Sequence, residues 1–513
     1  MLMRQGSDLP VRRCLNLVWI LLLSGTVSTA LVLFGWTTSA NAQASLDSQL
    51  RSVLQTAGFT GNIEATLPTR LGRPVNQKLA DTGRLLFFDK ILGLRNDNSC
   101  AGCHSPAFGF GDTQPMAIGV NNNNNFVGPS RSGTRNQRRS PLVANTIFYP
   151  ALMWTAKFTA PTGNPFDPSQ GFVFSPPENT VFGEPTLLAA QSSIPSTELT
   201  ELAGFTGLTQ NPTTIFGSRH FIFDDGQGQA LPAPVGNFHN FPIQDAVDAR
   251  LNAIPEYRKL FGEVFNTNGT PFPPGGITIS MRRQALAEFQ TSLTAANAPL
   301  DRFVRGENNA MSARQKEGAL LFFGKAKCVG CHAVAGQANE MFSDFQLHRI
   351  AGPQLAPAFG VGKGNVIFDG PVENEDFGAE QTTGAQAHRY MFRTAPLRNL
   401  KVSPAFFHNG AFKTLEAAIT HHLDVEASLR VFRPDASHVS MGLKLGPSEV
   451  MVVAGIDPVL RPPLKLTKME FTALVEFVRE GLFDSRVSQF CSRRPASVPS
   501  GLPLQTFQGC PGT

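Results

Sequence analysis

The sequence lacks a strong imbalance of charge. Its 513 residues include 44 Lys and Arg against 39 Asp and Glu, which gives a formal net charge of +5 at pH 7. Removing residues 1–42 takes away three Arg and one Asp, so the formal charge falls to +3. So mild a balance does not favour binding to nucleic acid or to an anionic membrane surface.

Long apolar runs are scarce as well. The one such run, Leu15 to Phe34, follows three arginines and precedes the small-residue site Ala40-Asn41-Ala42. This order is typical of a secretory signal peptide, so we predict that residues 1–42 are removed and that the protein is exported to the periplasm. The run is long for a signal peptide, so an uncleaved membrane anchor is the alternative.

Cysteine is the third scarce feature, with seven in the whole chain. Cys14 lies in the predicted signal peptide. Cys491 and Cys510 lie in a tail rich in Pro, Ser and Gly, residues 486–513, where an oxidising compartment predicts a disulfide. The remaining four cysteines fall into two short motifs.

These two motifs, Cys100–His104 and Cys328–His332, both have the pattern C-x-x-C-H of c-type haem attachment. Two thiols three residues apart on one helical turn each form a thioether with a haem vinyl group, and the adjacent histidine becomes an axial ligand of the iron. A zinc site or a disulfide is the alternative for one motif, but two copies favour haem. Attachment of c-type haem normally takes place outside the cytoplasm, which agrees with export. We predict two covalent haems, attached at Cys100, Cys103, Cys328 and Cys331, with His104 and His332 as iron ligands.

One phrase precedes both motifs. Residues 83–88 read Gly-Arg-Leu-Leu-Phe-Phe, and residues 318–323 read Gly-Ala-Leu-Leu-Phe-Phe. Apolar spacing predicts an amphipathic helix over Asn76–Asp89, and a capping box from Ser312 to Gln315 predicts the start of its counterpart. The repetition indicates an internal duplication of a haem-binding helical unit.

Strand signals are sparse, so we predict a mostly α fold with two cytochrome c-like haem domains and long loops. The domains are predicted over residues 43–298 and 299–485, with the boundary in the linker 298–303. Two stretches rich in Pro and Gly are predicted to be loops, residues 160–185 and 204–242. Further helices are predicted from Ile254 toward Phe265, over Arg282–Ala295, and from a capping box at Thr467–Glu470 to about Phe483.

Several motifs outside the pentapeptides resemble the bacterial di-haem cytochrome c peroxidase family, which includes the MauG-type enzymes. The resemblance covers roughly residues 75–485, in order, and is carried by Leu85–Asp89, Arg139–Asn145 with Trp154, Leu300–Phe303, Phe322–Lys325, Phe392–Asn399 and Phe407–Gly410. It implies that the first haem is peroxidatic and that the second haem receives and relays electrons. It also implies hydrogen peroxide as substrate and a small electron-donor protein, a cytochrome c or a cupredoxin, as partner.

The resemblance assigns roles on the open side of the first haem. Many family members carry a removable histidine ligand sixteen residues after His104, where this chain has Val120, so this side is expected to stay open. A ligand brought in by the asparagine-rich loop is the alternative. The family's acid/base glutamate follows a pocket proline by six residues, a spacing that Pro195 and Glu201 match. Glu198 is the alternative.

The resemblance also assigns the relay and the second haem. Trp154 aligns with a tryptophan that carries electrons between the haems, with a buried core tryptophan as the alternative. The sixth ligand of the second haem is expected fourteen residues after His408, which is His422. Two imidazoles give a less positive potential than histidine and methionine. The other candidates for this ligand are His421, Met441 and Met451.

Calcium remains undecided by the sequence. Family members bind calcium through an asparagine and two main-chain carbonyls, and Arg139 takes the place of that asparagine. A cationic side chain there repels calcium and substitutes for its charge.

The resemblance therefore implies an exported di-haem peroxidase that reduces hydrogen peroxide to water. A MauG-like oxidase of a protein or organic substrate is the alternative, which the histidine at position 422, in place of the MauG-type tyrosine, disfavours. A third possibility, a pure electron carrier, requires both irons to have six ligands, and Val120 argues against it.

Overall fold

The computed structural model describes residues 45–123, 125–174, 180–204, 207–210, 219–222, 240–266, 276–357, 375–446 and 452–511. The chain divides into Met1–Ser52 and a compact unit, Val53–Thr513, and only the second is considered below. The predicted signal peptide and Met451 lie outside the described residues. Among the helices of the described ranges, none is long and apolar enough to cross a membrane. The division into haem domains at residue 298 stays a prediction.

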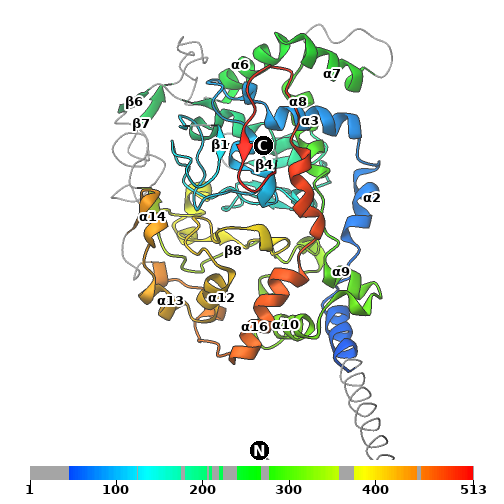
Figure 1. The fold of residues 1–513 in the computed structure, drawn as a ribbon, viewed down its shortest axis with the longest axis vertical. Coiled ribbons are helices and arrows are strands. Elements are labelled where there is room, and N and C mark those ends of the chain that lie inside the picture. Colours follow the sequence, from blue (N-terminus) through cyan, green and yellow to red (C-terminus); the bar gives the residue numbers. More distant parts are fainter. Residues whose placement is uncertain are drawn as a thin grey trace, which may run out of the picture. The chain divides into compact units, whose positions relative to one another are not determined.

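Helices supply most of the regular structure, as expected (Figure 1). Their bounds are α2 Leu67–Leu71, α3 Gln77–Phe88, α4 Cys100–Cys103, α5 Leu187–Gln191, α6 Asn240–Asn252, α7 Pro255–Phe265, α8 Ile279–Thr291, α9 Pro299–Val304, α10 Ala313–Phe323, α11 Glu380–Thr383, α12 Leu415–Leu423, α13 Val425–Val431, α14 Ala436–Ser440 and α16 Lys468–Glu476.

The strands are short and form small sheets. They are β1 Phe126–Val127, β2 Ala151–Leu152, β3 Phe158–Thr159, β4 Phe172–Phe174, β5 Thr180–Val181, β6 Gly207–Gln210, β7 Arg219–Ile222, β8 Leu347–His348, β9 Leu355–Pro357, β10 Phe392–Arg393, β11 Leu443–Leu445 and β12 Thr506–Phe507. One antiparallel sheet has the order β2-β3-β4-β5, and β6 pairs with β7, β8 with β10 and β9 with β11. The parallel pair β1-β12 attaches the C-terminal tail.

The duplicated phrase forms the same packing unit twice. In Figure 1, α3 lies beside α8, and α10 lies beside α16. Each first helix crosses its partner at a glycine of the repeated phrase. A Cβ atom on Gly83 would lie 1.8 Å from the Ala285 carbonyl oxygen, and one on Gly318 would lie 2.0 Å from that of Ala473. Only glycine permits so close an approach of the main chains.

The predicted helix starts are confirmed by their caps. The Asn76 side chain accepts a hydrogen bond from the Leu79 amide, and so α3 begins at Gln77. Ser312 and Gln315 form the predicted capping box of α10, and Thr467 and Glu470 form that of α16. A side-chain acceptor at this position satisfies an amide that has no partner within the helix.

Three predictions of the local structure were wrong. Residues 204–242 contain the paired strands β6 and β7 rather than loop alone. Residues 160–185 contain β4 and β5 rather than loop alone. The alternation of buried Phe172, exposed Val173 and buried Phe174 is the strand signal that was overlooked. Helix α8 begins at Ile279, before the predicted Arg282, because Thr278 caps it.

The C-terminal tail packs against the first haem motif's half of the unit. The predicted disulfide between Cys491 and Cys510 is confirmed, with Cα atoms 5.4 Å apart. Phe507 of β12 contacts Phe88 of α3, with ring centroids 5.9 Å apart. Figure 1 shows this red strand beside β1.

We predict that Gly83→Ala and Gly318→Ala each lower the free energy of unfolding by about 1–3 kcal/mol, because the added methyl group forces two helices apart. Glu317→Ala, at an exposed position next to Gly318, is the matched control and should change it by less than about 0.5 kcal/mol. Denaturant unfolding of the three variants measures the difference. Equal stability of Gly318→Ala and Glu317→Ala would contradict the packing described here.

Candidate active site

The site residues that the sequence predicts around the first haem motif meet at one cavity of about 300 Å³. They reach it from α4, from the turn at residues 194–203 and from the loop that follows β2. The predicted residues that line it are Cys100, Cys103, His104, Trp154, Pro195 and Glu201. Segments more than 90 residues apart in the sequence therefore build a single pocket of a size usual for ligand sites.

The His104 ring is held by a main-chain carbonyl. Its Nδ1 lies 2.9 Å from the carbonyl oxygen of Phe110, which adopts a left-handed conformation with φ of 57°. Burial lowers the pKa of His104, so the imidazole stays neutral. A neutral imidazole with Nδ1–H donated to a carbonyl presents Nε2 as the ligating nitrogen. The residues present thus fit an axial ligand of haem.

The second motif repeats this arrangement. The Nδ1 of His332 lies 2.9 Å from the carbonyl oxygen of Phe342, whose φ is 58°. Burial, and then the nearby His422, lower the pKa of His332 to about 4. The phenylalanine of the repeated phrase flanks the histidine in both halves: Phe87 lies 6.3 Å from His104 and Phe322 lies 6.4 Å from His332 between ring centroids.

His422 faces His332. Their ring centroids are 6.4 Å apart, which leaves space for one metal atom at the usual metal–imidazole distance of about 2.0–2.1 Å on each side. The Nδ1 of His422 lies 2.8 Å from the Ala418 carbonyl oxygen, so its Nε2 is the ligating atom.

The competing candidates for this position are less suitable. Both ring nitrogens of His421 already have partners, with Nδ1 3.1 Å from the Ser428 hydroxyl and Nε2 2.9 Å from the Ile350 carbonyl. Met441 packs against the apolar cluster that contains Phe407 and Phe412. Met451 lies outside the described residues. Two neutral, facing imidazoles fit a haem iron with two histidine ligands.

Glu201 lies on a π-helical turn, Leu199–Ala203, at the cavity wall. Burial raises the pKa of Glu201, the neighbouring Glu198 carboxylate raises it further, and Lys157 opposes the shift. Glu198 has a different environment, since its carboxylate is partly exposed and lies 3.3 Å from the Lys157 ammonium. A carboxyl with a raised pKa exchanges a proton near neutral pH, which suits Glu201 to acid/base chemistry.

Val120 supports this turn rather than facing the cavity. Its amide donates a hydrogen bond to the Thr200 carbonyl (3.1 Å), and its side chain is fully buried. A Cβ on Gly119 would lie 1.8 Å from the same carbonyl oxygen, so glycine is required there. Among the described residues that line the cavity, His104 is the single histidine.

Trp154 lines the first cavity and is hydrogen-bonded to strand β10 of the second half. Its Nε1–H donates to the Arg139 carbonyl (2.7 Å), and its own carbonyl accepts from the Arg393 amide (2.7 Å). The Arg139 amide in turn donates to the His408 carbonyl (2.6 Å). Trp154 is thus fixed at both its ring and its main chain.

The Arg139 side chain occupies the position at which the resemblance implied calcium. Its buried guanidinium donates to the main-chain carbonyls of Asp112 and Gln114 and to the Ser403 hydroxyl. The oxygen atoms that could bind calcium here therefore already accept hydrogen bonds from the Arg139 guanidinium, which is itself a cation. This donor set does not fit calcium.

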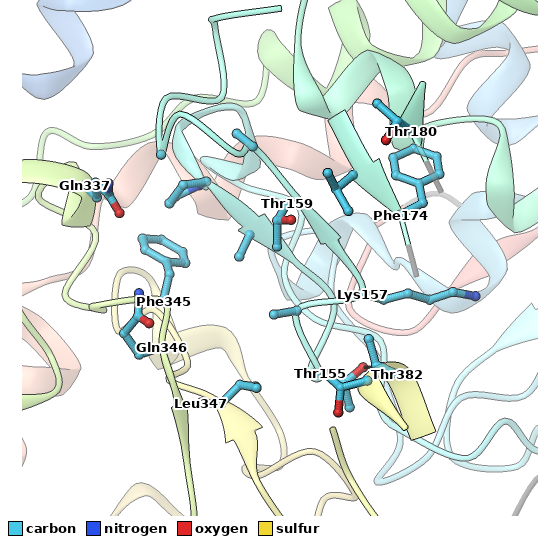
Figure 2. A pocket seen from close by; sticks show the side chains of 17 residues that line it. Thr155, Lys157, Thr159, Phe174, Thr180, Gln337, Phe345, Gln346, Leu347 and Thr382 are labelled. Atoms are coloured by element: carbon cyan, nitrogen blue, oxygen red, sulfur yellow. Dashed lines mark hydrogen bonds between the residues drawn. The ribbon is translucent and has the colours of Figure 1, made fainter. Parts of the chain in front are cut away.

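A second cavity, of about 610 Å³, opens beside the loop that follows Trp154 (Figure 2). Strands β2–β5 form one wall, and residues 345–347 and 382–383 form another. Hydroxyl groups of threonines line it together with Phe345 and Phe174. Lys157 lines both cavities.

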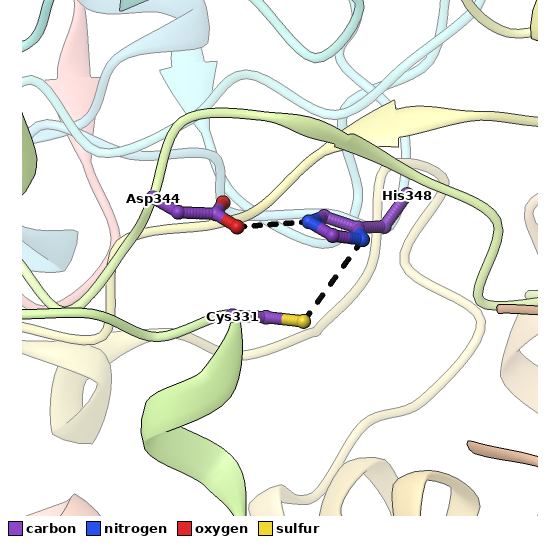
Figure 3. Close-up of side chains that lie close together, drawn as sticks. All are labelled: Cys331, Asp344 and His348. Atoms are coloured by element: carbon purple, nitrogen blue, oxygen red, sulfur yellow. Dashed lines mark hydrogen bonds and ion pairs between the residues drawn. The ribbon is translucent and has the colours of Figure 1, made fainter. Parts of the chain in front are cut away.

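Cys331, Asp344 and His348 form a cluster that superficially resembles a metal site (Figure 3). His348 lies between two carboxylates, with Nε2 2.9 Å from Asp344 and Nδ1 2.6 Å from Asp457. Hydrogen bonding to Asp344 and then to the other neighbours raises the pKa of His348 far above its usual range, so the ring is an imidazolium. An imidazolium cannot bind a metal, and the Cys331 sulfur belongs to the haem motif.

Comparison with known proteins agrees with this arrangement. Residues 77–309 match the family described as di-haem cytochrome c peroxidase. The chain is a relative of the di-haem cytochrome c peroxidases. It is 26% identical over 361 residues to the methylamine utilization protein MauG of Methylophilus methylotrophus. The aligned region covers 70% of this chain and 76% of that protein. The chain is 22% identical over 350 residues to the cytochrome c551 peroxidase of Pseudomonas aeruginosa, covering 68% and 72%.

Known structures share the fold. A MauG-like protein associated with microbial copper homeostasis is 20% identical with a TM-score of 0.51, covering 81% of this chain and 92% of that one. The diheme peroxidase BthA of Burkholderia thailandensis is 18% identical with a TM-score of 0.50, covering 84% and 91%. The relationship to this family shows that the protein is an oxidoreductase of the haem-peroxidase type. Its cofactor is haem c.

We predict that the variants His422→Ala and His421→Ala distinguish which of the two neighbouring histidines is the ligand of the second haem. Loss of His422 should convert one haem from low-spin to high-spin in the visible spectrum of the oxidised protein, because a strong-field ligand is removed. Loss of His421 should leave the spectrum unchanged. A low-spin second haem in His422→Ala would contradict the assignment.

Proposed function

We propose that this protein is an exported, periplasmic di-haem peroxidase that reduces hydrogen peroxide to water with electrons from a small redox protein. The observation that supports this most directly is the meeting of Glu201, Pro195 and the Cys100–His104 motif at one cavity. The relationship to cytochrome c peroxidases supports the same activity.

Haem attached at Cys100 and Cys103, with His104 as ligand, supplies the redox chemistry that breaks the O–O bond. The residues of the chain handle the proton. The Glu201 carboxylate takes a proton from one peroxide oxygen and returns it to the other, so that the departing oxygen leaves as water. Pro195 forms part of the wall and offers no N–H that would compete for the carboxylate.

Reduction of one hydrogen peroxide to two water molecules consumes two electrons and two protons. We assign the second motif, with His332 and His422, to the reception of these electrons from a cytochrome c or a cupredoxin. We assign Trp154 as the relay between the two sites, a role that its fixed position supports, because it is hydrogen-bonded to the main chain of both Arg139 and Arg393.

We expect Glu201→Gln to lower kcat/KM for peroxide by about 100- to 10,000-fold, because glutamine cannot accept and return a proton. Glu198→Gln is the matched control and should retain activity within a few-fold, since this carboxylate pairs with Lys157. Peroxide-dependent oxidation of reduced cytochrome c measures both. A larger loss of kcat/KM in Glu198→Gln than in Glu201→Gln would assign the acid/base role to Glu198 instead.

The pH profile gives a further prediction. Glu201 must be deprotonated to take the first proton, and burial raises its pKa above the usual carboxyl range. Activity should therefore rise with increasing pH through that raised pKa and fall as the pH is lowered below it. Glu201→Gln should abolish this limb of kcat/KM against pH. A limb that persists in Glu201→Gln belongs to another group.

A second candidate function is MauG-like oxidation of an organic or protein substrate. The second cavity favours it, because it opens beside the loop that carries Trp154. Thr382→Trp, which adds a bulky side chain at the wall of that cavity, distinguishes the two. The peroxidase proposal expects unchanged oxidation of reduced cytochrome c in this variant. Selective loss of peroxide-dependent oxidation of a phenol or an amine would support the oxidase instead.

A further inference from the structure

The C-terminal tail reaches the peroxide site through a buried side chain, Gln505. This residue is 1% exposed, and both the oxygen and the nitrogen of its side-chain amide have hydrogen-bond partners just before the first haem motif. Its Oε1 accepts a hydrogen bond from the Ser99 hydroxyl (2.6 Å), and its Nε2 donates to Asn98 Oδ1 (3.1 Å). Gln505 and Asn98 are 407 residues apart in the sequence.

Asn98 continues this connection to Glu201. Its Nδ2 donates to the Glu201 main-chain carbonyl (2.9 Å), and its Oδ1 also accepts from the Arg131 guanidinium (2.8 Å). Asn98 is fully buried. Every strong hydrogen-bonding atom of its side chain is therefore used, and loss of a partner leaves a buried polar group unsatisfied.

Gly102 makes the convergence of these side chains possible. A Cβ at this position of the C-x-x-C-H motif would lie 1.9 Å from Asn98 Oδ1 and 2.7 Å from Gln505 Nε2. The amides thus pack directly on the main chain between the two haem-attachment cysteines. The tail is itself attached to the unit by β12, which pairs with β1, and it is closed by the disulfide between Cys491 and Cys510.

We propose that Gln505 and Asn98 are positioning residues that fix the main chain at Glu201, so that its carboxyl keeps its aim into the cavity. The disulfide-closed tail is then part of the peroxide site. This inference rests on the proposed acid/base role of Glu201. It follows from the path of hydrogen bonds from Gln505 to Asn98 and from Asn98 to the Glu201 carbonyl.

The test is a double-mutant cycle in the full-length protein with both haems attached. Gln505→Ala should lower kcat for peroxide by about 10- to 100-fold with little change in KM, because a shifted acid/base group slows chemistry more than binding. In the Glu201→Gln background, the same substitution should cost less than about twofold, because residues that act as a unit are not additive. Haem content and the visible spectrum should stay those of the parent.

The matched control is Ser500→Ala. Ser500 ties the same tail to Asp89 (2.6 Å) but does not contact Asn98. It should retain kcat within about twofold. Should Gln505→Ala fail to take up haem, Gln505→Glu replaces it in the cycle, since it keeps the acceptor for Ser99 and loses the donor to Asn98.

Two outcomes would overturn the inference: full activity of the Gln505 variants, or a loss that is equally large in the Glu201→Gln background. The second outcome would indicate a general structural role of the tail. Failure of the proposed function has a different signature, which is an unchanged turnover in Glu201→Gln whatever the Gln505 variants do.

Discussion

Each haem-motif histidine is fixed by one hydrogen bond from its Nδ1 to the carbonyl of a phenylalanine in left-handed conformation. This bond sets the tautomer and aims Nε2 away from the main chain. The hydrogen bond depends on helices α3 and α10, which precede the two motifs in the sequence. Phe87 of α3 and Phe322 of α10 each pack on the histidine ring and on the phenylalanine whose carbonyl accepts the bond. Those helices in turn depend on the glycine crossings at Gly83 and Gly318.

What stands opposite each histidine differs between the halves. The first motif faces a cavity whose wall carries Glu201, and the neighbouring loop is tied to the Thr200 carbonyl by the Val120 amide. The second motif faces His422. Among the described residues, the second motif therefore has an opposing histidine, whereas the lining of the first cavity contributes no histidine besides His104.

Local chemistry made part of this predictable from the sequence. The haem motifs, the capping boxes at Ser312 and Thr467, and the disulfide all follow from short-range rules, and the structure bears out the capping boxes and the disulfide. The resemblance to the peroxidase family assigned Pro195 and Glu201 to the site, and both line the cavity.

The remaining features depend on contacts across the fold. Nothing near Arg139 in the sequence shows that its guanidinium binds the carbonyls of Asp112 and Gln114. The tail was given no role, because the partners of Gln505 lie more than 400 residues away. The strands β4 and β5 were missed because a three-residue alternation is weak evidence within a stretch rich in Pro and Gly.

The central claim is that one haem keeps an open side while the other has two histidine ligands. Electron paramagnetic resonance of the oxidised protein as isolated tests it most directly. The account predicts one high-spin ferric signal and one low-spin signal typical of two imidazole ligands. Two low-spin signals would contradict it, because the first haem would then carry a sixth ligand and peroxide would have no place to react.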